Sequence, residues 1–298
     1  MQAAPVMNKP HPTPVYRKVL NVAKIVLAFA LFVVFMLPFI LVIVNSAKTA
    51  QEISLSPVTM PTDWFQMWTN VVGVVTNPNF SYFSAFADSF IITAVSLAVI
   101  VVCSAMAAWV LVRNKTWWST AIFMMLVASM VVPFQVVMLP LVQWLRIAGD
   151  FLGIKLSGNY VGIVLCYLGF GCAMSVFIFH GFIKGIPLEL EEAADIDGCS
   201  RPAIFFRIVF PLLQPTAVTV LILNGIWIWN DYLLPLLILG SSGEVQTLPL
   251  AVSMFAGSYV KQWDLILTSA LLAMLPIIVL FLFAQRYIIQ GMVEGSIK

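Results

Sequence analysis

Six long apolar stretches decide which solvent this chain can fold in. Each has at least 20 residues and at most one Asp, Glu, Lys, Arg or His, and they cover residues 25–44, 89–112, 116–145, 156–183, 212–239 and 265–285. A transmembrane helix needs about 20 predominantly apolar residues. The chain is 61% hydrophobic and 9% charged, whereas soluble domains carry about 25% charged residues. The sequence therefore predicts an all-α membrane protein with six transmembrane helices.

Lys and Arg are distributed unevenly between the segments that separate these stretches. Six spans place both termini on one side of the membrane, and basic residues are enriched on the cytoplasmic side. With both termini inside, eleven of the 15 Lys and Arg fall on the inner side and four on the outer side. We therefore expect a cytoplasmic tail over 1–21, a six-helix membrane domain over 22–290 and a cytoplasmic C-terminal tail over 291–298. The first stretch is too long for the apolar core of a signal peptide, so we expect it to be retained.

An acidic segment, ELEEAADIDGCSRPAIFFRIVFPLLQP, covers residues 189–215 just before the fifth span. Pro187 is tolerated in the first turn of a helix, and the helix dipole favours the acids that follow it. Gly198 suits the left-handed position that ends a helix. The segment therefore predicts a helix, a glycine turn and a second helix on the cytoplasmic face.

Three interpretations of this acidic segment are open. A helix lying on lipid is usually rich in Lys and Arg, and the inner leaflet attracts basic residues rather than acids. A solvated connector would not need small residues such as Ala193 and Ala194. We therefore favour the third interpretation, a helix that docks into a groove on a soluble partner protein.

The sequence lacks the motifs by which the chain could drive transport or catalyse a reaction by itself. No GxxxxGK[ST] loop occurs, so the sequence has no motif for nucleotide phosphates. Asp231 is the only acid deep inside a predicted span, and ion-driven carriers usually show more intramembrane ionisable groups. The two histidines, His11 and His180, accompany no HExxH or GxSxG motif. We expect no catalytic residue, no metal site and no cofactor on this chain. We expect a partner protein to supply the energy for its function.

The acidic segment resembles the "EAA" loop of permeases in binding-protein-dependent ABC importers. The resemblance is carried by residues 192–198, EAADIDG, followed by Ile208, Pro211 and Pro215. The rest of the chain is similar to the carbohydrate branch, the second permease of maltose-type and multiple-sugar importers. The stretches that match in order along the chain are 48–53, 132–135, 139–141, 229–232, 247–250 and 285–298.

This resemblance implies a type I ABC importer permease fold with residues 22–290 as the permease domain and 184–211 as its coupling loop. The implied partners are a second permease, two ATP-binding subunits that hold ATP and Mg, an external solute-binding protein and membrane lipid, with no nucleic acid. The implied location is the cytoplasmic (inner) membrane of a bacterium or archaeon. The residues expected to contact the ATPase are Glu191, Glu192, Ala193, Ala194, Asp197, Gly198, Ile208 and Pro211, with Gln290, Gly291 and Gly295 in the tail.

Candidates for the translocation path lie in the fifth span, at Asn224, Trp227, Asn230 and Asp231. Aromatic faces beside amide or acid groups suit a sugar, because its CH faces stack while its hydroxyls form hydrogen bonds. Alternatively, Asn230 and Asp231 join this span to a neighbouring helix as polar contacts. The sequence thus predicts the permease subunit of an ATP-driven sugar or oligosaccharide importer. The alternatives are a permease for glycerol phosphate or a polyamine, and a carrier driven by an ion gradient.

Overall fold

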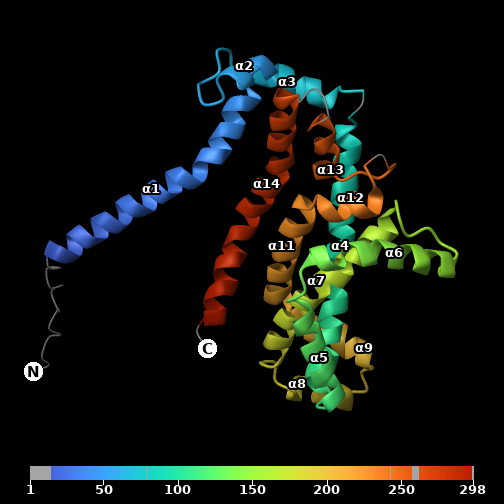
Figure 1. The fold of residues 1–298 in the computed structure, drawn as a ribbon. Coiled ribbons are helices and arrows are strands. Elements are labelled where there is room, and N and C mark those ends of the chain that lie inside the picture. The colour runs from blue at the N-terminus through green and yellow to red at the C-terminus, as the bar shows by residue number, and fades with distance from the viewer. Residues whose placement is uncertain (1–14, 79, 242, 257–261, 297–298) are drawn as a thin grey trace, which may run out of the picture.

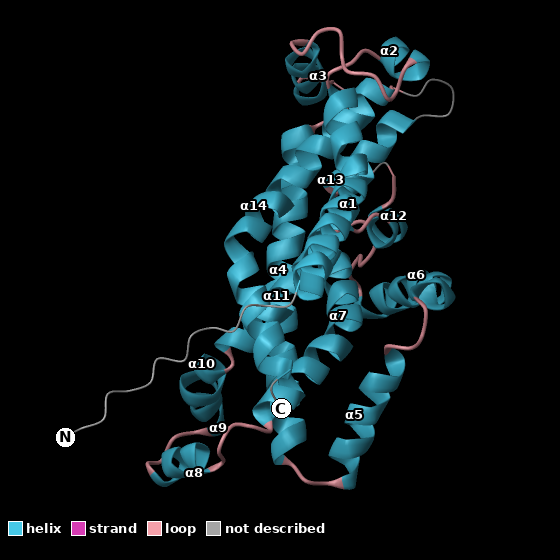
Figure 2. Cartoon of the chain, turned by 90° about the vertical axis from the view of Figure 1, so that its left-hand side faces the viewer, coloured by secondary structure: helices cyan, strands magenta, loops and turns pink. Residues whose placement is uncertain are grey.

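The computed structural model describes residues 15–78, 80–241, 243–256 and 262–296, and Figure 1 shows these residues as a set of helices. No strand occurs in this described part of the chain. Long helices run side by side through the molecule, and short helices lie at both ends (Figures 1 and 2). The predicted all-α fold class is therefore confirmed.

Four long helices form the bundle at the centre of the molecule. They are α4 (Tyr82–Arg113), α7 (Tyr160–Ile183), α11 (Gln214–Asn230) and α14 (Trp263–Ser296). The contact between α4 and α7 is the most extensive. Both helices bury small residues, including Ala105 and Ala108 on α4 and Gly171 and Ala173 on α7. Small residues let helix backbones approach closely, which is how helices associate in lipid.

The first helix, α1 (Val15–Ser46), lies largely apart from this bundle (Figure 1). Its contacts within the chain are mainly with α14, and its buried residues are Val44, Asn45 and Ser46 at the end. The preceding apolar side chains, such as Phe32 and Phe35, are exposed. Such a surface suits lipid or a second membrane protein, because water would leave this apolar area unfavourably hydrated.

The third predicted span, 116–145, is not one straight helix. It forms α5 (Trp117–Ser129) and α6 (Phe134–Leu152), which meet at an angle of 109°. Pro133 stands at the N-cap of α6 with extended backbone. Proline lacks an N–H and disfavours helical conformation in the residue before it, so the helix stops before Pro133 and restarts after it.

The fifth predicted span, 212–239, is also interrupted, and the expectation that Asp231 lies inside a helix is wrong. The chain leaves α11 after Asn230, and α12 (Leu233–Leu239) begins after Tyr232. Asp231 Oδ1 accepts a hydrogen bond from the backbone N–H of Leu233 at 3.1 Å. A short acceptor side chain at this position starts a new helix by satisfying one of its free N–H groups.

Short helices cover the end of the molecule that is opposite the acidic segment. They are α2 (Ala50–Leu55), α3 (Gln66–Val75), α13 (Leu248–Val252) and the 3₁₀ turn η2 (Ser253–Ala256). Lys48 is fully buried beside them, and its Nζ donates to Asn45 Oδ1 at 3.1 Å and to the Ser56 carbonyl at 2.8 Å. Asp88, at the start of α4, accepts from Tyr160 Oη and from the Gln246 N–H. These polar contacts fix this end of the bundle.

The acidic segment forms the other end of the molecule. It contains α8 (Glu189–Ile196), α9 (Arg201–Ile204), the π-turn η1 (Phe205–Val209) and α10 (Phe210–Leu212). The run 201–212 meets α11 at 77°. The predicted order of helix, glycine turn and helix is confirmed, with the second helix continuing through a π-turn.

Three helical segments are long and apolar enough to cross a membrane, or five if each bent pair counts as one span. The three lie within α1, α4 and α7, and the apolar part of α14 reaches at least from Trp263 to Val279. The total of six spans and the cytoplasmic position of both termini remain predictions.

Gly171 offers a test of the close packing between α4, α7 and α11. A Cβ atom at this position would lie 2.7 Å from Asn224 Oδ1 and 2.8 Å from Ile100 Cδ1, whereas one at Gly169 would meet nothing within 4 Å. We expect the free energy of unfolding of Gly171→Ala to be about 1–3 kcal/mol lower than that of Gly169→Ala, because overpacking strains a filled core. Both variants gain the same helix propensity. Thermal unfolding of the full chain in detergent micelles measures the difference, and equal midpoints would contradict this packing.

Candidate functional site

Helix α8 lies at the end of the molecule shown at the bottom of Figure 2, and several of its acids are exposed. Glu192, Ala193 and Asp197 are exposed, and Ile196 is 87% exposed. An exposed isoleucine beside acids and an alanine is a surface that a protein groove can cover. The structure therefore brings these sequence-predicted coupling residues together on one accessible side of the loop.

Gly198 ends α8 in the conformation that the sequence predicts. Its φ is +80°, in the left-handed region that residues with a Cβ rarely adopt. The Cys199 N–H donates to the Ala194 carbonyl at 2.9 Å, which is the bond that closes a glycine-ended helix. The turn directs the chain from α8 into α9 and fixes the angle between the two halves of the loop.

Glu191 points inward and is only 3% exposed. Its carboxylate forms an ion pair with the Arg113 guanidinium of α4, with Nη2 2.7 Å from Oε1. Arg113 Nε donates to the same oxygen at 2.8 Å, and Trp109 Nε1 donates to Oε2 at 2.9 Å. Arg113 Nη2 also donates to the Ile186 carbonyl at 3.0 Å. Although the resemblance grouped Glu191 with the partner-facing residues, the structure uses its carboxylate to fasten α8 to α4.

Trp109 and Arg113 are functional residues that sequence reasoning missed. They lie four residues apart on α4, so both side chains project from the same face of that helix. The Trp109 ring also packs on Phe205 of η1, with centroids 5.4 Å apart. The spacing was visible in the sequence, but nothing in it identified a partner about 80 residues away.

The remaining loop residues have structural positions of their own. Ala194 is buried, and Ile208 packs against the main hydrophobic core. Pro211 is exposed and directly follows the π-turn, near the end of the helical run 201–212. Ala194 and Ile208 hold the loop against the main core.

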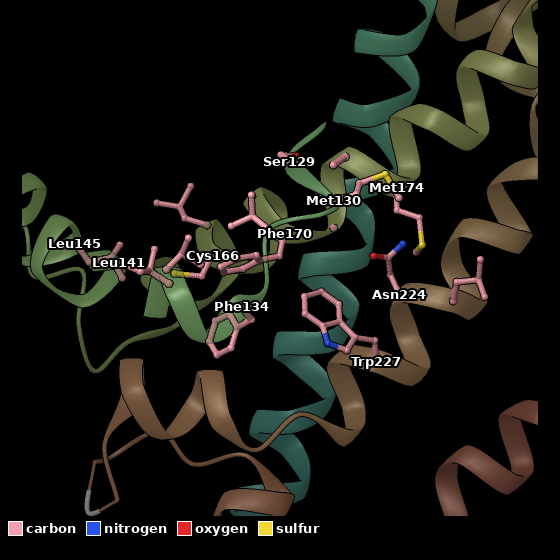
Figure 3. A pocket seen from close by; sticks show the side chains of 17 residues that line it. Ser129, Met130, Phe134, Leu141, Leu145, Cys166, Phe170, Met174, Asn224 and Trp227 are labelled. Carbon is pink, nitrogen blue, oxygen red and sulfur yellow. The ribbon is translucent and has the colours of Figure 1, made fainter. Parts of the chain in front are cut away.

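A groove of about 840 Å³ opens in the middle of the molecule, between α5, α6, α7 and α11 (Figure 3). Its lining is mostly apolar and includes Phe134, Phe170 and Met174. Two predicted path residues, Asn224 and Trp227, reach into it from α11. The groove thus has an aromatic ring and an amide residue in its lining, and the role of Asn224 and Trp227 in a solute path remains a prediction.

The polar groups in and near the groove are tied to neighbouring helices. Asn224 Nδ2 donates to Ser175 Oγ at 3.1 Å and to the Val220 carbonyl at 2.9 Å. Its Oδ1 is buried and accepts no hydrogen bond from the described residues. This oxygen is packed against α7, where a Cβ atom at Gly171 would lie 2.7 Å from it.

Asn230 and Asp231 lie outside the lining of this groove. Asn230 is exposed and donates to the Ile226 carbonyl of its own helix at 2.7 Å. Asp231 Oδ2 accepts from Tyr167 Oη of α7 at 3.2 Å. The contact of Asp231 with α7 favours the alternative interpretation, in which this acid joins two helices.

The tail residues Gln290, Gly291 and Gly295 fall near the end of α14, where the structure describes the helix but not these side chains. Their expected contact with an ATPase remains a prediction.

The fold and the projecting loop are those of a membrane transport permease. Residues 100–294 match the family of binding-protein-dependent transport system inner membrane components, and the chain belongs to this family. It is 40% identical over 285 residues to the probable starch degradation products transport system permease protein AmyC of Thermoanaerobacterium thermosulfurigenes, over 95% of this chain and 99% of that protein.

Two further comparisons agree with this assignment. The chain is 36% identical over 216 residues to the melibiose/raffinose/stachyose import permease protein MelC of Bacillus subtilis (strain 168), over 72% of this chain and 76% of that protein. Its fold matches a chain in the crystal structure of a bacterial ABC transporter involved in the import of the acidic polysaccharide alginate. The TM-score is 0.74 at 17% identity, over 94% of this chain and 99% of that chain. The predicted family of ABC importer permeases is therefore confirmed.

Replacing Arg113 by Met tests the attachment of α8. The variant leaves the Glu191 carboxylate buried with Trp109 as its remaining side-chain donor. Loss of one partner from a buried ion pair costs about 3–5 kcal/mol, and because Arg113 is partly exposed we expect about 2–3 kcal/mol of lost unfolding free energy. Arg201→Met, at an exposed position of the same loop, should change stability by less than about 0.5 kcal/mol.

The double variant Arg113→Met/Glu191→Leu should recover most of this loss, because it removes the stranded charge together with its partner. Urea unfolding of the full chain in mixed micelles gives all four free energies. If Arg113→Met proved no more costly than Arg201→Met, the ion pair would not fasten α8.

Proposed function

We propose that this chain is the permease subunit of an ATP-driven importer of sugars or oligosaccharides. A second permease completes the translocation path, two ATP-binding subunits supply the energy, and an external binding protein delivers the solute. The proposal is supported by the family assignment and by relatives whose names refer to starch degradation products and to melibiose, raffinose and stachyose.

The observation that carries the proposal is the division of α8 into two faces. Its inner face is fastened by Glu191 to Arg113 of α4, and its outer face offers Glu192, Ala193 and Asp197 to solvent. A partner that pushes on the outer face therefore moves α4 through a charge-assisted contact rather than bending a free loop. In this proposal the partner is the ATP-binding subunit, and its closure moves the ends of the membrane helices as a rigid unit.

The proposed solute path runs along the groove between α6, α7 and α11. Trp227 is 40% exposed and offers an aromatic face to the CH groups of a sugar, while the buried Asn224 holds α11 to Ser175 of α7. The Trp227 ring is held edge-on by Tyr167, with centroids 5.4 Å apart and an interplanar angle of 88°. The groove is open on one side, and in this proposal the second permease closes it.

The proposed orientation places α8 in the cytoplasm and α2, α3 and α13 outside. In Figure 1, α14 runs from the α2 and α3 end toward the α8 end, and α1 extends from the α2 and α3 end to about the middle level of the molecule. Basic residues, which favour the cytoplasmic side, gather at the α8 end, with Arg113, Lys115 and Lys184 lining one cavity.

Glu192→Lys tests the coupling role of the outer face. We expect ATP-dependent oligosaccharide uptake to fall about tenfold or more, because reversing a charge in a docked interface costs at least 1.4 kcal/mol. Gly198→Val should act in the same direction by straining the left-handed turn. The measurement is uptake into vesicles that contain this chain and all its partner subunits, normalised to the amount of inserted chain.

The matched control is Asp150→Lys, which makes the same charge change at an exposed position far from α8, and it should leave uptake unchanged. Full uptake by Glu192→Lys would remove the coupling role. Uptake by the chain alone, driven by an ion gradient without ATP, would instead identify a carrier and overturn the proposed function.

A further inference from the structure

A second cavity lies at the α8 end of the bundle, where α4, α5 and α7 come together. Its volume is about 620 Å³, and polar and apolar groups both line it. The basic residues Arg113, Lys115 and Lys184 contribute to its wall, together with His180. Nothing in the proposed transport mechanism uses Lys115 or Lys184.

The charges around this cavity are not balanced. Arg113 is engaged by Glu191, but no carboxylate of the described residues lies within 4 Å of Lys115 or Lys184. Glu189 lines an adjoining cavity together with both lysines and forms no ion pair with either. Both lysine side chains are exposed. Two unpaired ammonium groups facing one cavity favour an anion there.

The cavity lies at the depth of the molecule where a membrane surface is expected. Lys184 directly follows α7, and Lys115 lies two residues beyond the end of α4; both helices are long enough to span. Trp117 and Trp118 stand beside it, 66% and 60% exposed, with their rings stacked. Exposed tryptophans of this kind mark the headgroup level of a bilayer. Further along α5, Ile122 and Met125 are exposed and apolar, as lipid tails require.

We propose that this cavity binds the phosphate group of an anionic phospholipid. Lys115 and Lys184 hold the phosphate from the two sides of the cavity, and the stacked Trp117 and Trp118 rings cover the glycerol region. The lipid tails then lie on the apolar surface of α5. This chemistry is shared by free phosphate, but free phosphate would gain nothing from the tryptophans or from the apolar surface below them.

The bound lipid would contact α4 and α7 on one side of the cavity and α5 on the other. Arg113 borders the same cavity and also carries the ion pair with Glu191. The bound phosphate therefore adds a negative charge beside the contact that fastens α8. This proposal requires that the chain lies in a membrane, and it does not depend on the identity of the transported solute.

Native mass spectrometry of the full chain tests this site. The probes are phosphatidylglycerol and phosphatidylcholine with identical tails, each titrated into the detergent-solubilised protein. We expect phosphatidylglycerol to bind more tightly, and Lys115→Gln/Lys184→Gln to weaken its binding about 30-fold, since each basic residue near an anionic surface contributes a factor of about five. Lys115→Arg/Lys184→Arg should keep the binding.

The control removes two positive charges elsewhere on the chain. Arg146→Gln/Lys155→Gln alters one exposed position in α6 and one just after it, and it should leave phosphatidylglycerol binding unchanged. Equal weakening by the two pairs would overturn the site, because the effect would then come from net charge. Displacement of the lipid by millimolar inorganic phosphate would also overturn it and identify a free-phosphate site. Equal binding of both lipids by the unaltered chain would show that the cavity takes no anionic headgroup, leaving its lysines for a partner protein.

Discussion

The buried contact between Glu191 and Arg113 determines how the projecting loop relates to the membrane helices. A carboxylate without water is stable only when strong donors surround it, and here α4 supplies all of them from one face through Arg113 and Trp109. The acidic loop consequently cannot swing freely, and its direction is that of α4. Gly198 then sets the second half of the loop at a fixed angle to the first. A force on the exposed acids of α8 is therefore transmitted to α4, which forms with α7 the most extensively packed helix pair of the bundle.

The two bends in the bundle show how backbone can be irregular inside a membrane protein. At Pro133 and at Asp231 the helical hydrogen bonds stop, and irregular backbone is tolerated in the membrane only where protein or a polar cavity surrounds it. Asp231 meets this condition by accepting bonds from Leu233 and from Tyr167. The 840 Å³ groove lies beside the bend between α5 and α6, since Ser129, Met130, Val132 and Phe134 all line it.

Much of the fold could be predicted from the sequence, because hydropathy reports directly on the solvent that a segment requires. The apolar stretches correspond to the long helices, and the acids, Pro187 and Gly198 correctly predicted the shape of the loop. Continuity of the backbone was harder to predict. Pro133 marks a bend in the sequence itself, whereas nothing marks the break at Asp231, because Leu, Ile and Val favour burial in helix or turn alike. The role of Glu191 depended on a contact with residues about 80 positions earlier, and no local pattern encodes such a contact. Of the four candidates for a translocation path, Asn224 and Trp227 line one groove, whereas Asn230 and Asp231 lie outside it, and their role in transport remains a prediction.

The short length of α5 has a consequence for how the membrane is sealed. Its 13 residues rise about 20 Å at 1.5 Å per residue, while the hydrocarbon core is about 30 Å thick. Beyond Ser129 the chain turns aside, and the open groove begins at this point. On this side of the protein α5 alone therefore covers about two thirds of the hydrocarbon thickness. The groove, whose lining includes Ser129 at the end of α5, lies beside the remaining third.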